Sequence, residues 1–277
     1  MDARPIGVFD SGVGGLTVAR ALQRELPAEA LVYLGDTARL PYGTKSPETI
    51  RRYARAAARQ LVERDIKLLV VACNTASSVA LEDLQRELAP LPVVGVVEPG
   101  AHAAVAACGG RPVLVLGTES TISGGAYVRA ITSYDSGVEV RGRACPLFVA
   151  LAEEGLVRGD IPRAVARRYL TADLLDGLGA IVLGCTHFPV LRETVAEIAG
   201  EVPIVDSAGT TAKRVRVALD RLGLAAAEGA ARPARVQLLA TDGTERFARV
   251  GGTFLGRSIE RGEVEVVDLG PGCVSLR

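Results

Sequence analysis

Two cysteines stand in closely similar surroundings. Cys73 and Cys185 each follow directly after an apolar run, residues 68–72 and 180–184 respectively. Runs of this length rich in Val, Ile and Leu predict strands buried on both faces, with each thiol at a strand's carboxyl end, where open α/β sheets hold their ligands. Buried packing is the competing interpretation for one free Cys. Two in matching positions, each followed by polar groups, favour a chemical role.

Two opposed thiols suit the inversion of a stereocentre by proton exchange. That reaction needs a base that removes hydrogen from one face of a carbon and an acid that delivers hydrogen to the other face. A thiol has an ordinary pKa of about 8.5, so neighbouring charges can favour either of its forms near neutral pH. The sequence therefore predicts one thiol on each wall of a shared cleft, with roles that exchange between the two directions.

Each thiol needs a polar assistant, and the sequence offers one for each. Asp10 ends the first apolar run and is the candidate for the first thiol, while His187 lies two residues after the second. Glu153 or Glu154 is the candidate to orient the imidazole. The competing interpretations are a loop-capping carboxylate for Asp10 and a strand-end histidine bonded to backbone for His187.

The elements that must position these residues alternate between strand and helix patterns, which is typical of a parallel sheet with crossover helices. Ser46 precedes a proline and is expected to cap the second helix, and Thr75 or Ser77 is expected to cap the helix after Cys73. The expected strands are 6–9, 30–34 and 68–72, and the expected helices are 16–26 and 47–64.

The landmarks of the first half recur about 110 residues further along the chain. A Gly-containing loop, a proline, a cysteine and an acidic residue follow successive apolar runs in the same order in both halves. Although all α/β chains share this rhythm, the similar offsets favour two pseudo-symmetric lobes, each a largely parallel sheet flanked by helices, with the active site in the cleft between them. We expect a discontinuous first lobe, residues 1–97 plus 208–277, and a second lobe, residues 98–207.

The composition limits the class of partner. The 277 residues carry 32 basic and 32 acidic side chains and no basic block, which favours a small-molecule partner over nucleic acid. No apolar segment approaches the roughly 20 residues of a membrane span, and the start lacks a secretion pattern, so a cytoplasmic protein is expected. Only two histidines and an odd set of cysteines without CxxC spacing argue against a metal centre or a disulfide framework. The cysteines are Cys73, Cys108, Cys145, Cys185 and Cys273.

Five segments together carry a family resemblance. They are residues 7–15 (GVFDSGVGG), 33–36 with 40–43 (YLGD and LPYG), 72–76 (ACNTA), 145–148 (CPLF) and 183–187 (LGCTH). Through them the chain resembles the glutamate racemases of the cofactor-independent aspartate/glutamate racemase superfamily over nearly its whole length. Ala150 and Phe188 stand where the family often has Pro and Tyr, and neither change removes a predicted catalytic group.

The resemblance implies interconversion of L- and D-glutamate for peptidoglycan synthesis, with Cys73 and Cys185 as the acid/base pair. It implies no cofactor, pyridoxal phosphate included, and a homodimer. It also favours Glu153 over Glu154 as the partner of the imidazole. The substrate-binding residues that it implies are Asp10, Ser11, Tyr42, Gly43, Asn74, Thr75, Thr118, Thr121, Thr186 and His187.

Three other functions stay open on the sequence. A racemase for another acid, such as aspartate, would use both thiols in the same way, because pocket dimensions decide the substrate. A thiol redox or Cys-nucleophile enzyme would need one thiol, assisted by His187. A binding protein that acts by contact would retain the cleft, although the intact thiol pair argues against a lost active site.

Overall fold

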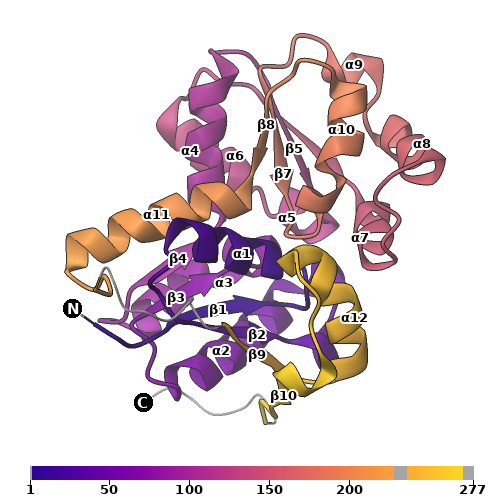
Figure 1. The fold of residues 1–277 in the computed structure, drawn as a ribbon. Coiled ribbons are helices and arrows are strands. Elements are labelled where there is room, and N and C mark those ends of the chain that lie inside the picture. Colours follow the sequence, from indigo (N-terminus) through magenta and orange to yellow (C-terminus); the bar gives the residue numbers. More distant parts are fainter. Residues whose placement is uncertain (1, 228–235, 271–277) are drawn as a thin grey trace.

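The computed structural model describes residues 2–227 and 236–270, and the chain forms two parallel sheets in separate lobes (Figure 1). The strands are β1 Ile6–Asp10, β2 Leu31–Gly35, β3 Leu68–Val71, β4 Val93–Gly95, β5 Val113–Gly117, β6 Val140–Ala144, β7 Ala180–Gly184, β8 Ile204–Asp206, β9 Val236–Ala240 and β10 Val264–Val266. Their order is β10-β9-β2-β1-β3-β4 in one sheet and β6-β5-β7-β8 in the other. Every strand pairing in the described residues is parallel, which confirms the predicted α/β class.

Helices cover both faces of each sheet, as expected for parallel strands joined by crossovers. They are α1 Leu16–Glu25, α2 Pro47–Val62, α3 Asn74–Glu87, α4 Val97–Cys108, α5 Glu119–Ser123, α6 Ala126–Tyr134, α7 Pro146–Glu153, α8 Asp160–Tyr169, α9 Ala172–Leu175, α10 Arg192–Ala199, α11 Ser207–Leu222 and α12 Thr244–Leu255. Short 3-10 turns occupy Thr37–Arg39, Tyr42–Thr44, Phe188–Leu191 and Arg261–Glu263. None of the helices in the described ranges is both long and apolar enough to cross a bilayer.

The two sheets share one topology. The order β2-β1-β3-β4 in the first corresponds strand for strand to β6-β5-β7-β8 in the second, so the predicted repeat is confirmed at the level of strand order. The strands β9 and β10 extend the first sheet beyond β2 and have no counterpart in the second. The chain passes between the sheets at α4 and α11, and the lobe boundaries given above stay a prediction.

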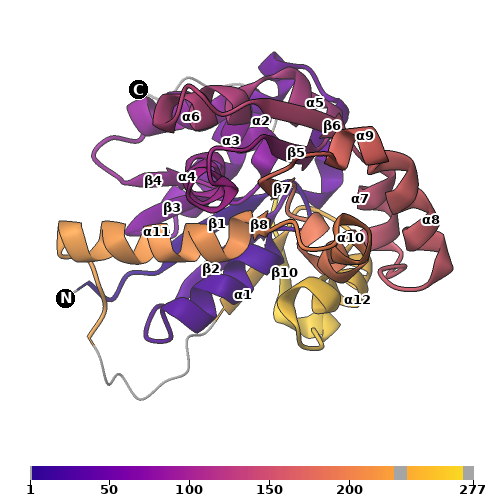
Figure 2. The same cartoon turned by 90° about the horizontal axis from the view of Figure 1, so that it is seen from above.

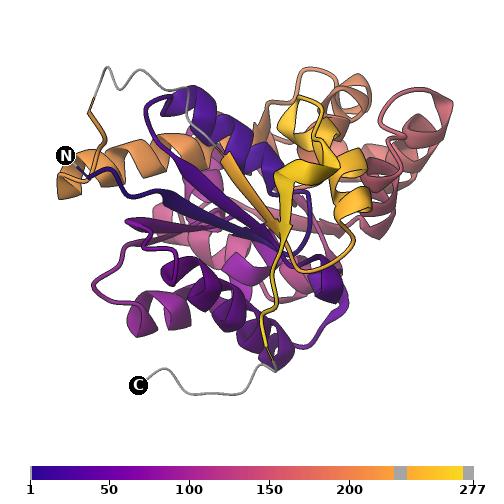
Figure 3. The same ribbon diagram turned by 60° about the horizontal axis from the view of Figure 1, so that its bottom comes forward.

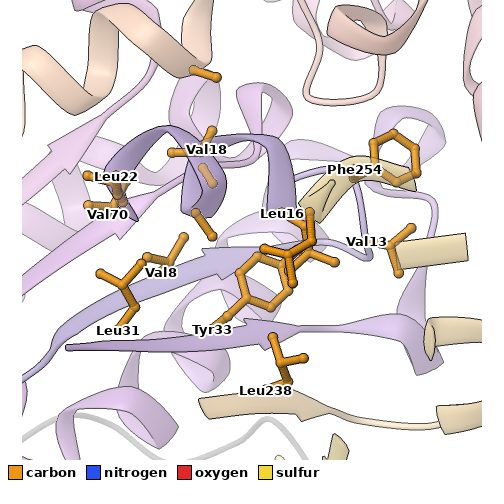
Figure 4. Close-up of a cluster of buried hydrophobic side chains, with 14 of the residues drawn as sticks. Val8, Val13, Leu16, Val18, Leu22, Leu31, Tyr33, Val70, Leu238 and Phe254 are labelled. Carbon is orange, nitrogen blue, oxygen red and sulfur yellow. The ribbon is translucent and has the colours of Figure 1, made fainter. Parts of the chain in front are cut away.

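A buried cluster fixes α1 and the loop before it against the first sheet. Figure 4 shows Leu16 of α1 next to Tyr33 of the sheet and Leu22 next to Val70, within one buried cluster. Burial of each such side chain stabilises the fold by roughly 1.5–3 kcal/mol. Because α1 begins directly after residues 11–15, this packing also holds that loop at the carboxyl end of β1.

The helix α11 joins the lobes. It begins at the end of β8 in the second sheet and runs along α1 of the first lobe, as Figures 1 and 2 show. Asp206 caps it, since its carboxylate accepts hydrogen bonds from the backbone of Ala208 and Gly209. Ser46 caps α2 in the same way through the N–H of Thr49, as predicted.

Candidate active site

The first predicted thiol lies at the N-terminus of a helix. Cys73 is the N-cap of α3, and its Sγ accepts a hydrogen bond from the backbone N–H of Ala76 at 3.4 Å. The prediction that Thr75 or Ser77 caps this helix is therefore wrong: Ser77 instead donates to the carbonyl of Val71 at 2.7 Å. The thiol is short enough to make the capping contact itself, because the residue before the helix already has extended backbone.

The surroundings of Cys73 favour its protonated form. Burial and the charge of Asp10 raise the pKa of the Cys73 thiol to about 12, although the hydrogen bonds with Ser11 and with the backbone of Ala76 oppose the shift. The hydroxyl of Ser11 lies 3.5 Å from the sulfur.

Asp10 is fully buried at the end of β1 and connects the two lobes. Its Oδ2 accepts from the N–H of Gly12 at 2.9 Å, and its Oδ1 accepts from the hydroxyl of Thr186 at 3.3 Å. The loop-capping interpretation therefore describes part of what this carboxylate does. Its other contact reaches the residue next to Cys185, which brings the two predicted half-sites together.

The second thiol has an imidazole beside it. The Sγ of Cys185 lies 3.9 Å from Nδ1 of His187, and Nε2 of the same ring lies 3.1 Å from Oε1 of Glu153. Burial lowers the pKa of His187, but the contacts with Cys185 and Glu153 outweigh burial and raise it to about 10. Glu153 is thus the carboxylate at the imidazole, whereas Glu154 lies 4.0 Å from Arg246.

Three hydroxyls meet across the lobes. Thr75 at the start of α3 lies 3.0 Å from Thr118 and 3.2 Å from Thr121, which belong to the loop and short helix after β5. Thr118 and Thr121 are also 3.0 Å apart. Gly43 packs so closely here that a Cβ at this position would lie 2.7 Å from the Cβ of Thr118. Four of the predicted residues, from both halves of the chain, therefore lie together at this point.

The side chain of Asn74 is held by a buried network. Its amide nitrogen donates to the hydroxyls of Tyr127 at 2.8 Å and Ser207 at 3.2 Å, and Ser207 in turn donates to the carbonyl of Leu183. Its Oδ1 is buried and has no hydrogen-bond partner among the described residues. A buried acceptor without a partner is costly, so this oxygen suits a ligand that brings an N–H group.

Tyr42 uses its hydroxyl inside the protein. It donates to Oδ2 of buried Asp36 at 2.6 Å, while Thr241 donates to Oδ1 of the same carboxylate at 3.0 Å. Burial raises the pKa of Tyr42 well above its usual value. A ligand contact at this point therefore falls to the backbone of Tyr42 and Gly43.

A cavity of about 320 Å³ opens between the loop after β2, the start of α5 and the helix α7. Its lining includes Gly43, Thr118 and Glu153 from the predicted site, together with apolar Pro146 and Val149. The described residues contain no group of three or more His, Cys, Asp or Glu side chains that could hold a metal ion.

Comparisons with known proteins agree with this arrangement. The family described as Asp/Glu/Hydantoin racemase matches residues 6–215. The chain belongs to this racemase family. A glutamate racemase of Geobacter metallireducens is 49% identical over 274 residues, which covers 97% of this chain and 98% of that relative. One of Chlorobium phaeobacteroides is 44% identical and covers 96% of each chain.

Solved structures of racemases share the whole fold. The glutamate racemase of Francisella tularensis, in complex with D-glutamate, has a TM-score of 0.89 and 35% identity, over 98% of this chain and 99% of that one. The glutamate racemase of Thermus thermophilus, in complex with beta-chloro-D-alanine, has a TM-score of 0.86 and 45% identity, over 97% and 99%. An aspartate racemase of Picrophilus torridus, at 18% identity and a TM-score of 0.58, shares the fold alone.

Sequence reasoning missed several residues that support this racemase site. Tyr127 and Ser207 hold Asn74, and Arg246 holds Glu153. Ser207 had a signal, since it follows the acidic landmark that recurs in both halves. Tyr127 and Arg246 had no such signal, because each is far along the chain from the residue that it contacts, 53 positions from Asn74 and 93 from Glu153 respectively.

Proposed function

We propose that this protein is a glutamate racemase that inverts Cα by proton transfer between Cys73 and Cys185. The observation that carries the proposal is that the two thiols follow equivalent strands, β3 and β7, of two lobes that polar contacts join next to each thiol. The choice of glutamate is supported by relatives of that name at 49% and 44% identity over nearly the whole chain.

The reaction needs only the protein's own groups. A thiolate on one face takes the Cα proton and becomes a thiol, and the electron pair stays on the substrate as a carbanion stabilised by its carboxylate. The thiol on the other face then delivers its proton to Cα and becomes the thiolate. In the free site burial beside Asp10 favours the protonated form of Cys73, and the imidazole of His187 lies 3.9 Å from the sulfur of Cys185. Asp10 and His187 thus assist one thiol each.

Short polar groups line the place where an amino acid would lie between the thiols. The unpartnered Oδ1 of Asn74 is an acceptor suited to the substrate ammonium. Hydroxyl and backbone donors suit its two carboxylates. The donors are Ser11, Gly43, Thr75, Thr118, Thr121 and Thr186.

The decisive experiment is exchange in deuterated water without added cofactor. The wild type, Cys73→Ser and Cys185→Ser are each given L-glutamate, D-glutamate and both aspartates. Inverted product with deuterium at Cα, lost in either variant and confined to glutamate, supports the proposal. The proposal is contradicted if the wild type incorporates no deuterium at Cα. It is also contradicted if either Cys→Ser variant still racemises glutamate. Inversion of aspartate alone would instead support the aspartate alternative.

The biological setting is part of the same proposal. We propose a cytoplasmic homodimer that supplies D-glutamate for peptidoglycan, on the strength of the family resemblance. Sedimentation of the purified chain tests the dimer. Rescue of a bacterial strain that requires D-glutamate, with a Cys185→Ser gene as the matched control, tests the supply of the amino acid.

A further inference from the structure

The helix α12 has no counterpart in the second lobe, yet it contacts the assistant of the second thiol. It lies in the segment that follows β9, on the side of the first lobe that faces α7 (Figures 1 and 3). Nη2 of Arg246 on α12 donates to Oε2 of Glu153 at 2.9 Å. The ring of Phe254, about two turns further along α12, lies edge-on to His187 with 5.3 Å between ring centroids.

Glu153 is held at both carboxylate oxygens. Oε1 contacts Nε2 of His187 at 3.1 Å, and Oε2 accepts from Arg246. A carboxylate bound at both ends cannot rotate away from the imidazole without breaking a charge-assisted contact. Arg246 therefore restricts Glu153 to the orientation in which it meets His187.

The position of Glu153 in its own helix makes this cation important. It is the last residue of α7, where the helix dipole presents partial negative charge and disfavours a carboxylate. The contacts with His187 and then with Arg246 nonetheless lower the pKa of Glu153 below its usual value. Without the guanidinium, the side chain would gain freedom to turn toward water.

The helix α12 is rigid enough to place Arg246. Phe247 is buried and packs edge-on against Tyr33 of β2, with ring centroids 6.1 Å apart. Phe254 is also buried, and Figure 4 shows it at the end of the cluster under α1. The first sheet thus fixes α12, while Glu153 belongs to the second lobe.

We propose that Arg246 is a positioning residue that holds Glu153 on His187 across the two lobes, and so serves the Cys185 half of the site alone. The kinetic part of this proposal rests on the racemase function proposed above, and the geometric part does not. Arg246 touches no reacting atom. It acts through Glu153, so its effect depends on the presence of that carboxylate.

The test compares Arg246→Gln with Arg261→Gln. Arg261 makes an exposed ion pair with Glu245, the neighbour of Arg246 on α12, at 2.5 Å, so its substitution controls for loss of a charge at this helix. We expect Arg246→Gln to lower kcat/KM roughly tenfold, Arg246→Lys to restore part of the loss, and Arg261→Gln to change nothing. In a Glu153→Gln background, Arg246→Gln should have no further effect.

Isotope effects show which half of the site is affected. The enantiomers have equal free energy, so kcat/KM must change equally in both directions. If Arg246 serves only Cys185, the primary deuterium isotope effect on kcat/KM rises for Cα-deuterated substrate of one hand and falls for the other. Equal losses in the wild-type and Glu153→Gln backgrounds, or isotope effects unchanged from the wild type, would overturn the proposal.

Nitrogen NMR of the imidazoles tests the geometry without catalysis. The chain has two histidines, so a His102→Gln variant identifies the signals of His187. We expect Arg246→Gln to move the Nε2 resonance of His187, and Arg261→Gln to leave it in place. An Nε2 resonance that Arg246→Gln leaves unmoved contradicts the positioning role. If the wild type does not racemise glutamate but Arg246→Gln still moves the Nε2 resonance of His187, the racemase proposal fails and the positioning role stands.

Discussion

The two half-sites occupy equivalent strand ends but support their thiols by different means. Cys73 caps a helix of the first lobe directly and receives an N–H from Ala76. Cys185 is followed by a turn and a 3-10 segment before its helix begins, and receives an imidazole from His187 instead. One thiol is paired with partial charge from a helix N-terminus, and the other with a full positive charge.

This difference teaches that a repeated fold can position two like groups without repeating their environment. Burial beside Asp10 raises the pKa of Cys73, while Cys185 lies beside the imidazole of His187, whose own pKa is raised to about 10. Two features distinguish the surroundings of Cys185. His187 lies in the turn after β7, and α12 contacts both His187, through Phe254, and Glu153, through Arg246.

The largest effect is expected from removal of the assistants. Asp10→Asn and His187→Gln should each lower kcat by roughly 10²- to 10³-fold, because each loses a group that supports proton transfer. Their primary isotope effects should change in opposite senses for the two Cα-deuterated enantiomers, since each acts on its own thiol. Changes in the same sense would show that the two assistants do not divide between the half-sites.

A smaller effect is expected from crowding the same two groups. A Cβ at Gly14 would lie 2.5 Å from Nδ1 of His187, and a Cβ at Gly15 would lie 2.5 Å from the Cβ of Asp10. Gly14→Ala and Gly15→Ala should therefore each cost roughly 10- to 100-fold in kcat by misplacing one assistant. Steady-state kinetics on both enantiomers, with melting temperatures as a check on folding, measure this. Wild-type kinetics in either variant would contradict the close packing.

Loss of the Ser11 hydroxyl should have a modest effect. Ser11→Ala removes the 3.5 Å contact with Cys73 and should lower kcat roughly three- to tenfold. Ser46→Ala is the matched control, because that hydroxyl caps α2 through Thr49 and should change stability by about 1 kcal/mol without changing kcat. Kinetics and denaturant unfolding of the pair check both expectations. Equal kcat in the two variants would remove Ser11 from the first half-site.

The smallest effect concerns stability against pH. The pKa of His187 rises from 6.5 to about 10 on folding, so its stabilisation is fully present below pH 6.5 and is lost as the pH rises through about 10. The difference in Tm between the wild type and His187→Gln should therefore shrink by a few degrees, on the order of 2–4 °C per kcal/mol, from pH 6 to pH 10.5. Calorimetry at several pH values measures it. A difference that grows with pH would contradict the charged imidazole.

Local pattern predicted the elements well. Apolar runs gave β1, β2 and β3 within about a residue, because a strand buried on both faces needs an unbroken apolar segment. The cap at Ser46 followed from local chemistry as well. The predicted cap of α3 was wrong. Hydroxyls are better capping groups in general, but here Thr75 contacts Thr118 of the other lobe, Ser77 donates to Val71 of the preceding strand, and Cys73 is the cap.

The sequence by itself determined the two thiols, their strand ends and the repeated order of the lobes, because each depends on residues close together in the chain. The tertiary structure alone decided which carboxylate meets His187, that Arg246 holds it, and which way the amide of Asn74 faces. Glu153 and Arg246 are 93 positions apart, and Asp10 and Thr186 are 176 apart. Contacts over such separations follow from the packing of α12 and the two sheets, which no local pattern encodes.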